Sequence, residues 1–345
     1  MRRSLRRSTW GLALTLLACE AVAASTGAHD ALRPAGPQAA SIADLWHLML
    51  AICTFVLVAV VAVMLVAVAR RRRADATTPP DIASLDRDEA RARAIVTGAV
   101  GATVVLLGVL LAGSVLTDRA LARLPLQQGL HIEITGKQWW WDVRYDDPDP
   151  SRVFTTANEI HIPVGTPVVL TLKSADVIHS FWVPSLHGKK DLIPGQTVTF
   201  TLRADVAGTY RGQCAEFCGY QHARMGMLVI ADPPDAFERW AQAQRMPAAS
   251  PASDQAQRGQ DVFMTTTCAM CHAITGTTAG ARAGPDLTHV ASRTTLAALT
   301  LPNDAGHLAA WIDDPHAFKP GTNMPAHALA PQDRDAIVAY LMTLK

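Results

Sequence analysis

The 345-residue sequence predicts a multidomain membrane protein with a two-helix transmembrane hairpin, an all-β domain and a C-terminal all-α domain. Residues 48–69 and 94–117 form uncharged runs of 22 and 24 residues, and a membrane-spanning helix needs roughly 20. Short β-type runs separated by Pro and Gly turn signals fill residues 130–232, which is typical of a sandwich or barrel. From residue 254 onward this strand signal disappears, and apolar residues at helical spacing take its place.

The composition excludes two broad classes of protein. Charged residues make up 18% of the chain and apolar residues 49%, unlike a disordered chain or a protein that coats nucleic acid, so no nucleic-acid partner is expected. The loop 70–93 holds seven arginines and five acidic residues, whereas residues 118–345 hold 19 basic and 22 acidic ones. Because arginine-rich loops stay in the cytoplasm, the N- and C-terminal parts are predicted on the periplasmic side of a bacterial inner membrane.

The N-terminus has the pattern of a secretory signal. Four arginines precede a short apolar run, and residues 1–18 are therefore predicted to be a signal peptide. Residues 16–19 resemble a bacterial lipobox, which would make Cys19 the lipidated mature N-terminus. Cleavage within the small residues 21–25 is the alternative. The expected segments after the signal are helix 42–69, cytoplasmic loop 70–93, helix 94–117, β domain 130–232, a helix and linker at 233–253, and the α domain 254–345.

One stretch of the β domain carries an unusual set of soft metal ligands. Cys214, Cys218, His222 and Met225 lie within twelve residues, and thiolate, imidazole and thioether donors select copper over magnesium or calcium. A single blue-copper site uses one cysteine, so the second one favours two coppers bridged by both sulfurs. The second imidazole must come from another loop, and His179, between two predicted strands, is the candidate. The alternative is a disulfide between the cysteines with incidental histidines.

Residues 40–240 resemble subunit II of a haem-copper cytochrome c oxidase. The dinuclear copper A motif of that family, Cys-x-Glu-x-Cys-x3-His-x2-Met, is matched by Cys214, Glu216, Cys218, His222 and Met225, and its upstream histidine by His179. The resemblance implies a cupredoxin-like barrel in which the cysteines bridge the coppers and the histidines cap them. It further implies weak ligation by Met225 and the Glu216 carbonyl, with the Glu216 carboxylate facing a magnesium site at the boundary with subunit I.

Residues 136–141, Gly-Lys-Gln-Trp-Trp-Trp, are similar to the aromatic patch of the same family. Trp139 matches the position at which electrons enter, and Trp140 and Trp141 are expected to be structural. Four aspartates follow this patch, namely Asp142, Asp146, Asp147 and Asp149. They form either an acidic docking surface for a basic partner or a solvent-exposed turn. Two further histidines match family sequence that we interpret as structural or subunit-facing, namely His161 and His187.

The C-terminal domain contains a separate cofactor motif. Cys268-Ala-Met-Cys271-His272 is a C-x-x-C-H sequence, in which two thioethers hold a c-type haem and the histidine binds its iron. A zinc half-site is the alternative, but no second cysteine pair follows. Met324 lies in a Pro-Gly-x-x-Met-Pro element that resembles the ligand loop of class I cytochromes c, and residues 255–345 match that family. Met324 is therefore the expected sixth ligand, with His289 second, and His/Met ligation raises the haem potential.

A subunit II fused to a cytochrome c domain resembles the caa3-type oxidases. The resemblance implies an electron-input subunit that passes electrons from cytochrome c, or from a quinol:cytochrome c reductase, through its own haem c and copper A to subunit I. The oxygen-reducing site lies on that other chain, and further oxidase subunits and membrane lipid are expected partners. The alternatives are the copper A subunit of a nitric oxide reductase and a stand-alone tethered electron carrier. Glu89, before the second span, is either an acid used in proton uptake or a residue solvated among arginines.

Overall fold

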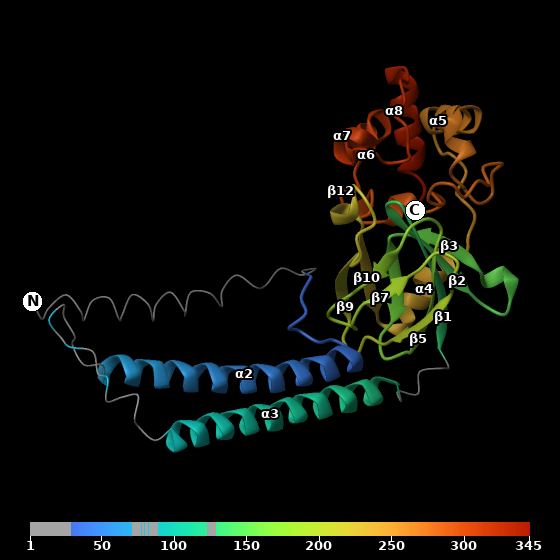
Figure 1. Cartoon of the computed structure of the whole chain (residues 1–345). Helices are drawn as coiled ribbons and strands as arrows, with labels where there is room; N and C mark the ends of the chain where they lie inside the picture. Colours follow the sequence, from blue (N-terminus) through green and yellow to red (C-terminus); the bar gives the residue numbers. More distant parts are fainter. Residues whose placement is uncertain (1–28, 71–76, 78, 80–81, 83–88, 123–128) are drawn as a thin grey trace, which may run out of the picture. The chain divides into compact units, whose positions relative to one another are not determined.

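The computed structural model describes residues 29–70, 77, 79, 82, 89–122 and 129–345. The predicted signal peptide, Cys19 and most of the predicted loop 70–93 lie outside these residues. The chain divides into two compact units, one formed by residues 37–125 and the other by residues 1–36 and 126–345. The first unit is helical, and the second contains the β domain and the C-terminal helical domain (Figure 1).

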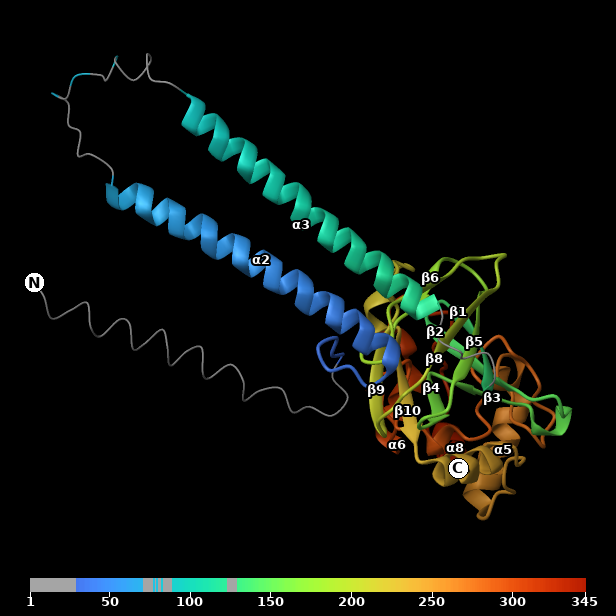
Figure 2. The same ribbon diagram turned by 90° about the horizontal axis from the view of Figure 1, so that it is seen from below.

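Two long helices, α2 (Pro37–Arg70) and α3 (Ala90–Ala122), lie side by side in the first unit (Figures 1 and 2). Both are long and apolar enough to cross a membrane, with mean hydropathies of 3.1 and 2.4. At about 1.5 Å per residue each helix is near 50 Å long, against ~30 Å for the hydrocarbon core. Each helix extends beyond the predicted span, 42–69 or 94–117, because the helical backbone continues into the polar residues that flank each apolar run.

The β domain contains two main sheets and a short pair of strands. The five-stranded sheet has the order β3-β2-β1-β5-β8, made of β1 (Leu130–Lys137), β2 (Trp140–Asp146), β3 (Phe154–Ala157), β5 (Val168–Ser174) and β8 (Val198–Leu202). The three-stranded sheet has the order β4-β10-β9, made of β4 (Glu159–Pro163), β9 (Gly208–Gln213) and β10 (Gly226–Asp232). A separate antiparallel pair joins β6 (His179–Phe181) to β7 (Lys190–Leu192).

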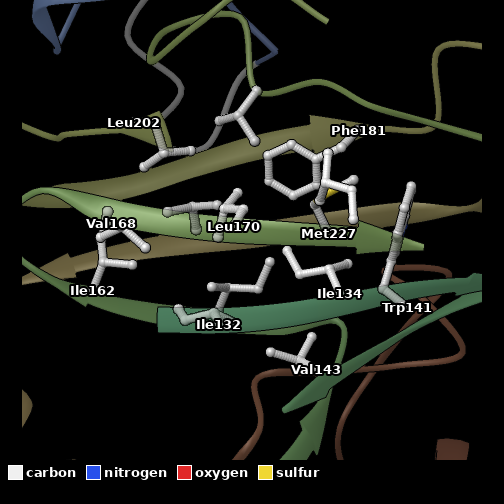
Figure 3. Close-up of a cluster of buried hydrophobic side chains, with 14 of the residues drawn as sticks. Ile132, Ile134, Trp141, Val143, Ile162, Val168, Leu170, Phe181, Leu202 and Met227 are labelled. Carbon is white, nitrogen blue, oxygen red and sulfur yellow. The ribbon is translucent and has the colours of Figure 1, made fainter. Parts of the chain in front are cut away.

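The hydrophobic core of this domain lies between the inward faces of the sheets (Figure 3). Alternate residues of β1, Ile132 and Ile134, are buried, as a strand with one solvated face requires. Trp141 is fully buried and lies edge-on to Phe181, with ring centroids 6.1 Å apart. Each such buried side chain contributes roughly 1.5–3 kcal/mol to folding. This burial favours the structural role expected of Trp141.

The C-terminal domain is a small helical fold. It follows α4 (Pro234–Gln244) and contains α5 (Asp254–Thr265), α6 (Ala305–Asp313), α7 (Pro315–Phe318) and α8 (Pro331–Leu341). A side chain at Gly259 would place its Cβ 1.9 Å from the Ala336 carbonyl oxygen, so this glycine allows α5 to cross α8 closely. The all-α prediction misses one short antiparallel pair, β11 (Thr295–Leu296) and β12 (Leu301–Pro302). The chain reverses direction there at residues 297–299, whose φ angles are positive. Positive φ angles are uncommon outside glycine, so the sequence gives little indication of this turn.

Candidate copper and haem sites

The metal cluster predicted from the cysteine motif is assembled in the β domain. His179 Nδ1 and Cys218 Sγ lie 3.9 and 3.7 Å from Cys214 Sγ, and all three residues are at most 2% exposed. The cysteines are free thiols rather than the disulfide of the alternative interpretation. Strand β6 supplies His179, and the connection between β9 and β10 supplies both sulfurs. The fold of the β domain thus joins donors that are 35 residues apart in sequence.

The remaining donors of the motif surround the same two sulfurs. His222 Nδ1 and Met225 Sδ lie 3.6 and 3.8 Å from Cys218 Sγ. The Glu216 carbonyl oxygen lies 3.3 Å from Cys214 Sγ. Two central sulfurs, an imidazole on each side, a thioether and a carbonyl oxygen form a soft ligand set that fits two copper ions.

The two thiols of the cluster differ in acidity. The Cys214 and Cys218 sulfurs lie 3.7 Å apart, and their hydrogen bond lowers the pKa of Cys214 to about 4 although burial opposes it. The same contact raises the pKa of Cys218 above its ordinary value. Because copper binds thiolates, binding through both sulfurs releases the protons that the thiols hold.

Asp176, which the sequence analysis did not single out, orients the first histidine ligand. His179 Nε2 lies 2.7 Å from the Asp176 carboxylate, so the ring donates there and presents Nδ1 to Cys214. The same carboxylate accepts hydrogen bonds from the backbone N–H groups of Gln138 and Val177. A carboxylate behind a metal-bound histidine fixes its tautomer and raises its basicity. The sequence signal for this role was the position of Asp176, three residues before His179.

Asp176→Asn is expected to weaken copper binding by roughly 10–100-fold, the usual effect of removing a carboxylate behind a ligand histidine. The amide keeps the size of the side chain but carries no charge to stabilise the donated proton. Titration of copper into the metal-free protein measures the effect. Asp146→Asn, which changes a partly exposed residue at the end of β2, is the matched control. Equal copper affinity in both variants would contradict the assigned role.

Gly136 leaves the space that the His179 ring occupies. A Cβ at position 136 would lie 2.8 Å from His179 Cδ2, closer than real side chains approach. Gly136→Ala is therefore expected to displace the ring and reduce the copper signal in electron paramagnetic resonance, with an unchanged haem spectrum. Gly280→Ala is the control, because no atom lies within 4 Å of the added carbon. A full copper signal in Gly136→Ala would show that the ring position is not critical.

Trp139 lies directly beside the cluster. Its indole Nε1 donates to the Cys218 carbonyl oxygen at 2.9 Å, and the Gln138 amide donates to the same oxygen at 2.8 Å. Gly219 has a φ of +111°, and a Cβ there would lie 3.1 Å from both side chains. The glycine after Cys218 thus lets the aromatic patch contact the cysteine loop.

The C-x-x-C-H segment provides the residues for a c-type haem. His272 Nδ1 lies 2.7 Å from the Pro285 carbonyl oxygen, to which it donates, and this leaves Nε2 as the electron-pair donor for iron. A Cβ at Gly284 would lie 2.6 Å from His272 Cε1, so the glycine lets this loop pack on the ring. Arg293 Nε is buried without a hydrogen-bond partner among the described residues. The acidic groups of a haem would provide a hydrogen-bond acceptor for Arg293 Nε. The residues around the C-x-x-C-H segment therefore fit the cofactor.

Comparison with known proteins gives the same two parts. Residues 147–232 match the family described as cytochrome c oxidase subunit II, periplasmic domain, and residues 256–345 match cytochrome c. A cytochrome c oxidase subunit 2 of Alkalihalophilus pseudofirmus is 34% identical over 91% of this chain and 90% of its own length. This chain belongs to the cytochrome c oxidase subunit 2 family. The predicted resemblance and the fold class are confirmed.

Two further relatives match shorter parts of the chain. The subunit 2 of Bacillus subtilis is 30% identical over 64% of this chain and 63% of its own length. A solved periplasmic domain of cytochrome oxidase subunit II from Bradyrhizobium japonicum is 30% identical, with a TM-score of 0.33, and covers 35% of this chain and 96% of its own. The family is that of an oxidoreductase complex, and its two domains imply copper A and haem c as cofactors.

Three of the histidines outside the two proposed ligand sets are His161, His187 and His289. Both ring nitrogens of His289 face carbonyl oxygens, at 2.8 Å from Lys345 and 3.0 Å from Met246, which disfavours it as an iron ligand. His161 lies 2.7 Å from an Asp232 carboxylate oxygen and stacks on Trp240. Burial lowers the pKa of His187 to about 4, and its ring is tilted against a phenylalanine of β8, with ring centroids 4.3 Å apart. These environments favour structural roles.

The aspartates after the aromatic patch are mostly paired within the domain. Asp142, Asp146 and Asp147 form ion pairs with Lys137, Arg144 and Arg152, at 2.8, 3.1 and 3.3 Å. The fourth, Asp149, caps the next short helical turn through its side chain. These contacts favour a solvated turn over an acidic dock.

Proposed function

We propose that this subunit takes electrons from a cytochrome c, or from a quinol:cytochrome c reductase, and delivers them to subunit I of a caa3-type oxidase. The observation that carries the proposal is the presence of two sets of candidate cofactor ligands in one chain. One is the cluster of soft donors around Cys214 and Cys218, and the other is the haem attachment segment with its oriented His272. A chain with these sites moves electrons and breaks no substrate bonds.

The copper residues have distinct assigned roles. Cys214 and Cys218 would bridge the ions, while His179 and His222 would each complete one side. Met225 and the Glu216 carbonyl would be weak ligands. When bound, the copper pair supplies a one-electron carrier, and the strands that flank the ligands hold them in nearly fixed positions. Asp176 keeps the proton on the outer nitrogen of His179.

The haem residues are assigned from the second motif. Cys268 and Cys271 would form the thioether links, His272 Nε2 would be one axial ligand and Met324 the other. When bound, the haem supplies a second one-electron carrier. Pro285 holds the tautomer of His272 through its carbonyl oxygen, and Met324 is partly buried in the segment that follows α7.

Three finer assignments complete the proposal. The Glu216 carboxylate, 3.7 Å from Lys189 Nζ and partly exposed, would face magnesium at the boundary with subunit I. Helices α2 and α3 would cross the bilayer and contact lipid. The arginines of the loop 70–93 support an orientation with both cofactor domains on the periplasmic side.

Purification of the complex in mild detergent tests this proposal. We expect a haem-bearing subunit with many spans to co-purify, and cyanide-sensitive oxygen uptake with ascorbate and a mediator. Nitric oxide turnover without oxygen uptake would favour the nitric oxide reductase alternative. Isolation of the chain alone, with no haem protein attached, would favour a tethered carrier.

A further inference from the structure

The segment that carries Met324 lies against the β domain beside the aromatic patch. We call residues 319–324 the bridging segment. Lys319 Nζ donates to the Trp139 carbonyl oxygen at 2.8 Å, and Asn323 Nδ2 donates to the Gln138 carbonyl oxygen at 3.3 Å. A second bond from Lys319 Nζ, to Ala297 at 3.2 Å, remains within the cytochrome domain. The bridging segment therefore contacts two consecutive residues of the patch.

Those two residues lead directly to a copper ligand. The Gln138 and Trp139 side chains both donate to the carbonyl oxygen of Cys218, at 2.8 and 2.9 Å. Two hydrogen-bonded connections thus run from the bridging segment to one cysteine, one through each residue. Trp139 is only 6% exposed, so this side of the β domain is covered by the chain itself.

A second interdomain contact lies at the start of β4. Glu159 is 4% exposed, and its Oε1 accepts hydrogen bonds from the backbone N–H and hydroxyl groups of Thr294 and Thr295, at 2.6–3.3 Å. Lys319 is similarly buried at 2% exposure, and this burial lowers its pKa to about 7. Polar groups buried to this extent are costly unless they are hydrogen-bonded, so these contacts fix one arrangement of the domains.

We propose that Glu159 and Lys319 are positioning residues that hold the bridging segment against Gln138 and Trp139 for electron transfer between the two cofactor sites. The inference rests on the proposed function. Neither residue belongs to the cofactor ligands, and each acts through the arrangement it maintains. Trp139 then receives electrons from the cytochrome domain of its own chain.

Flash reduction of the haem in the purified, fully loaded complex, followed by optical detection of haem reoxidation, tests the proposal. Glu159→Ala and Lys319→Ala are each expected to slow transfer to copper by about tenfold, the change produced by about 1.4 kcal/mol of lost docking free energy. Glu159→Gln retains an amide oxygen that accepts, so it should recover most of the rate. Asp235→Ala and Lys190→Ala, both at exposed positions, are the controls.

Hydrogen exchange provides a readout that does not depend on electron transfer. Amides of residues 137–140 and 319–324 should exchange faster in both alanine variants, with unchanged copper resonance and haem absorption. Wild-type rates of electron transfer and of hydrogen exchange in both alanine variants would overturn the positioning role. Slow electron transfer in a variant whose copper or haem signal has changed would also overturn it. If the unsubstituted chain transfers no electron to copper, the proposed function itself fails.

Discussion

Cys214→Ser is expected to abolish the mixed-valence copper signal in electron paramagnetic resonance while the haem c spectrum stays intact. Cys214 Sγ lies within 4 Å of the other cysteine sulfur, of His179 Nδ1 and of the Glu216 carbonyl oxygen, so it is central to the cluster. A hydroxyl is a hard donor that stays protonated, and it cannot replace a bridging thiolate on copper. The haem residues belong to a domain with its own hydrophobic core, which this substitution leaves unchanged.

A matched variant separates the effect of the site from a general effect of losing a cysteine. Cys53→Ser changes a free cysteine on α2 and should leave the copper signal unchanged. Copper content should fall in Cys214→Ser and stay normal in Cys53→Ser. Retention of the mixed-valence signal in Cys214→Ser would refute the ligand assignment.

Met324→Ala should leave the haem covalently attached but lower its reduction potential sharply. The attachment depends on Cys268 and Cys271, which this substitution does not alter. A methionine thioether as the second axial ligand raises the haem potential relative to other ligands, and its loss opens the iron to water or another base. Redox titration followed by haem absorption measures the change.

Met270→Ala is the control for this experiment, because Met270 lies within the attachment motif and is 73% exposed. We expect the haem reduction potential of Met270→Ala to stay close to that of the unsubstituted protein. An unchanged potential in Met324→Ala would point to another ligand. His289 is then the next candidate to substitute, although both of its ring nitrogens have carbonyl partners.

Local spacing made much of the molecule predictable. Cys214, Cys218, His222 and Met225 lie in one loop and its short helical turn, so their proximity follows from the sequence interval. The strands were predictable because one face is buried and the other solvated, as in Ile132 and Ile134 of β1. The ends of α2 and α3 could not be predicted in this way, because hydrophobicity marks the apolar run and not the end of backbone hydrogen bonding.

Contacts between distant segments could not be predicted in the same way. Glu159 meets Thr294 across 135 residues, and Lys319 meets Trp139 across 180. No periodicity relates such pairs, because they depend on how two domains with separate hydrophobic cores pack. Asp176 is an intermediate case: it is close to His179 in sequence, but only the turn before β6 brings its carboxylate to the ring.

The order in which the two cofactors are reduced tests the central claim most directly. Reduced cytochrome c would be mixed rapidly with the oxidised, cyanide-inhibited complex, while haem c and copper A are followed at separate wavelengths. We predict that haem c is reduced first and that copper A follows as electrons leave the haem. Reduction of copper A while haem c stays oxidised would contradict the proposed path.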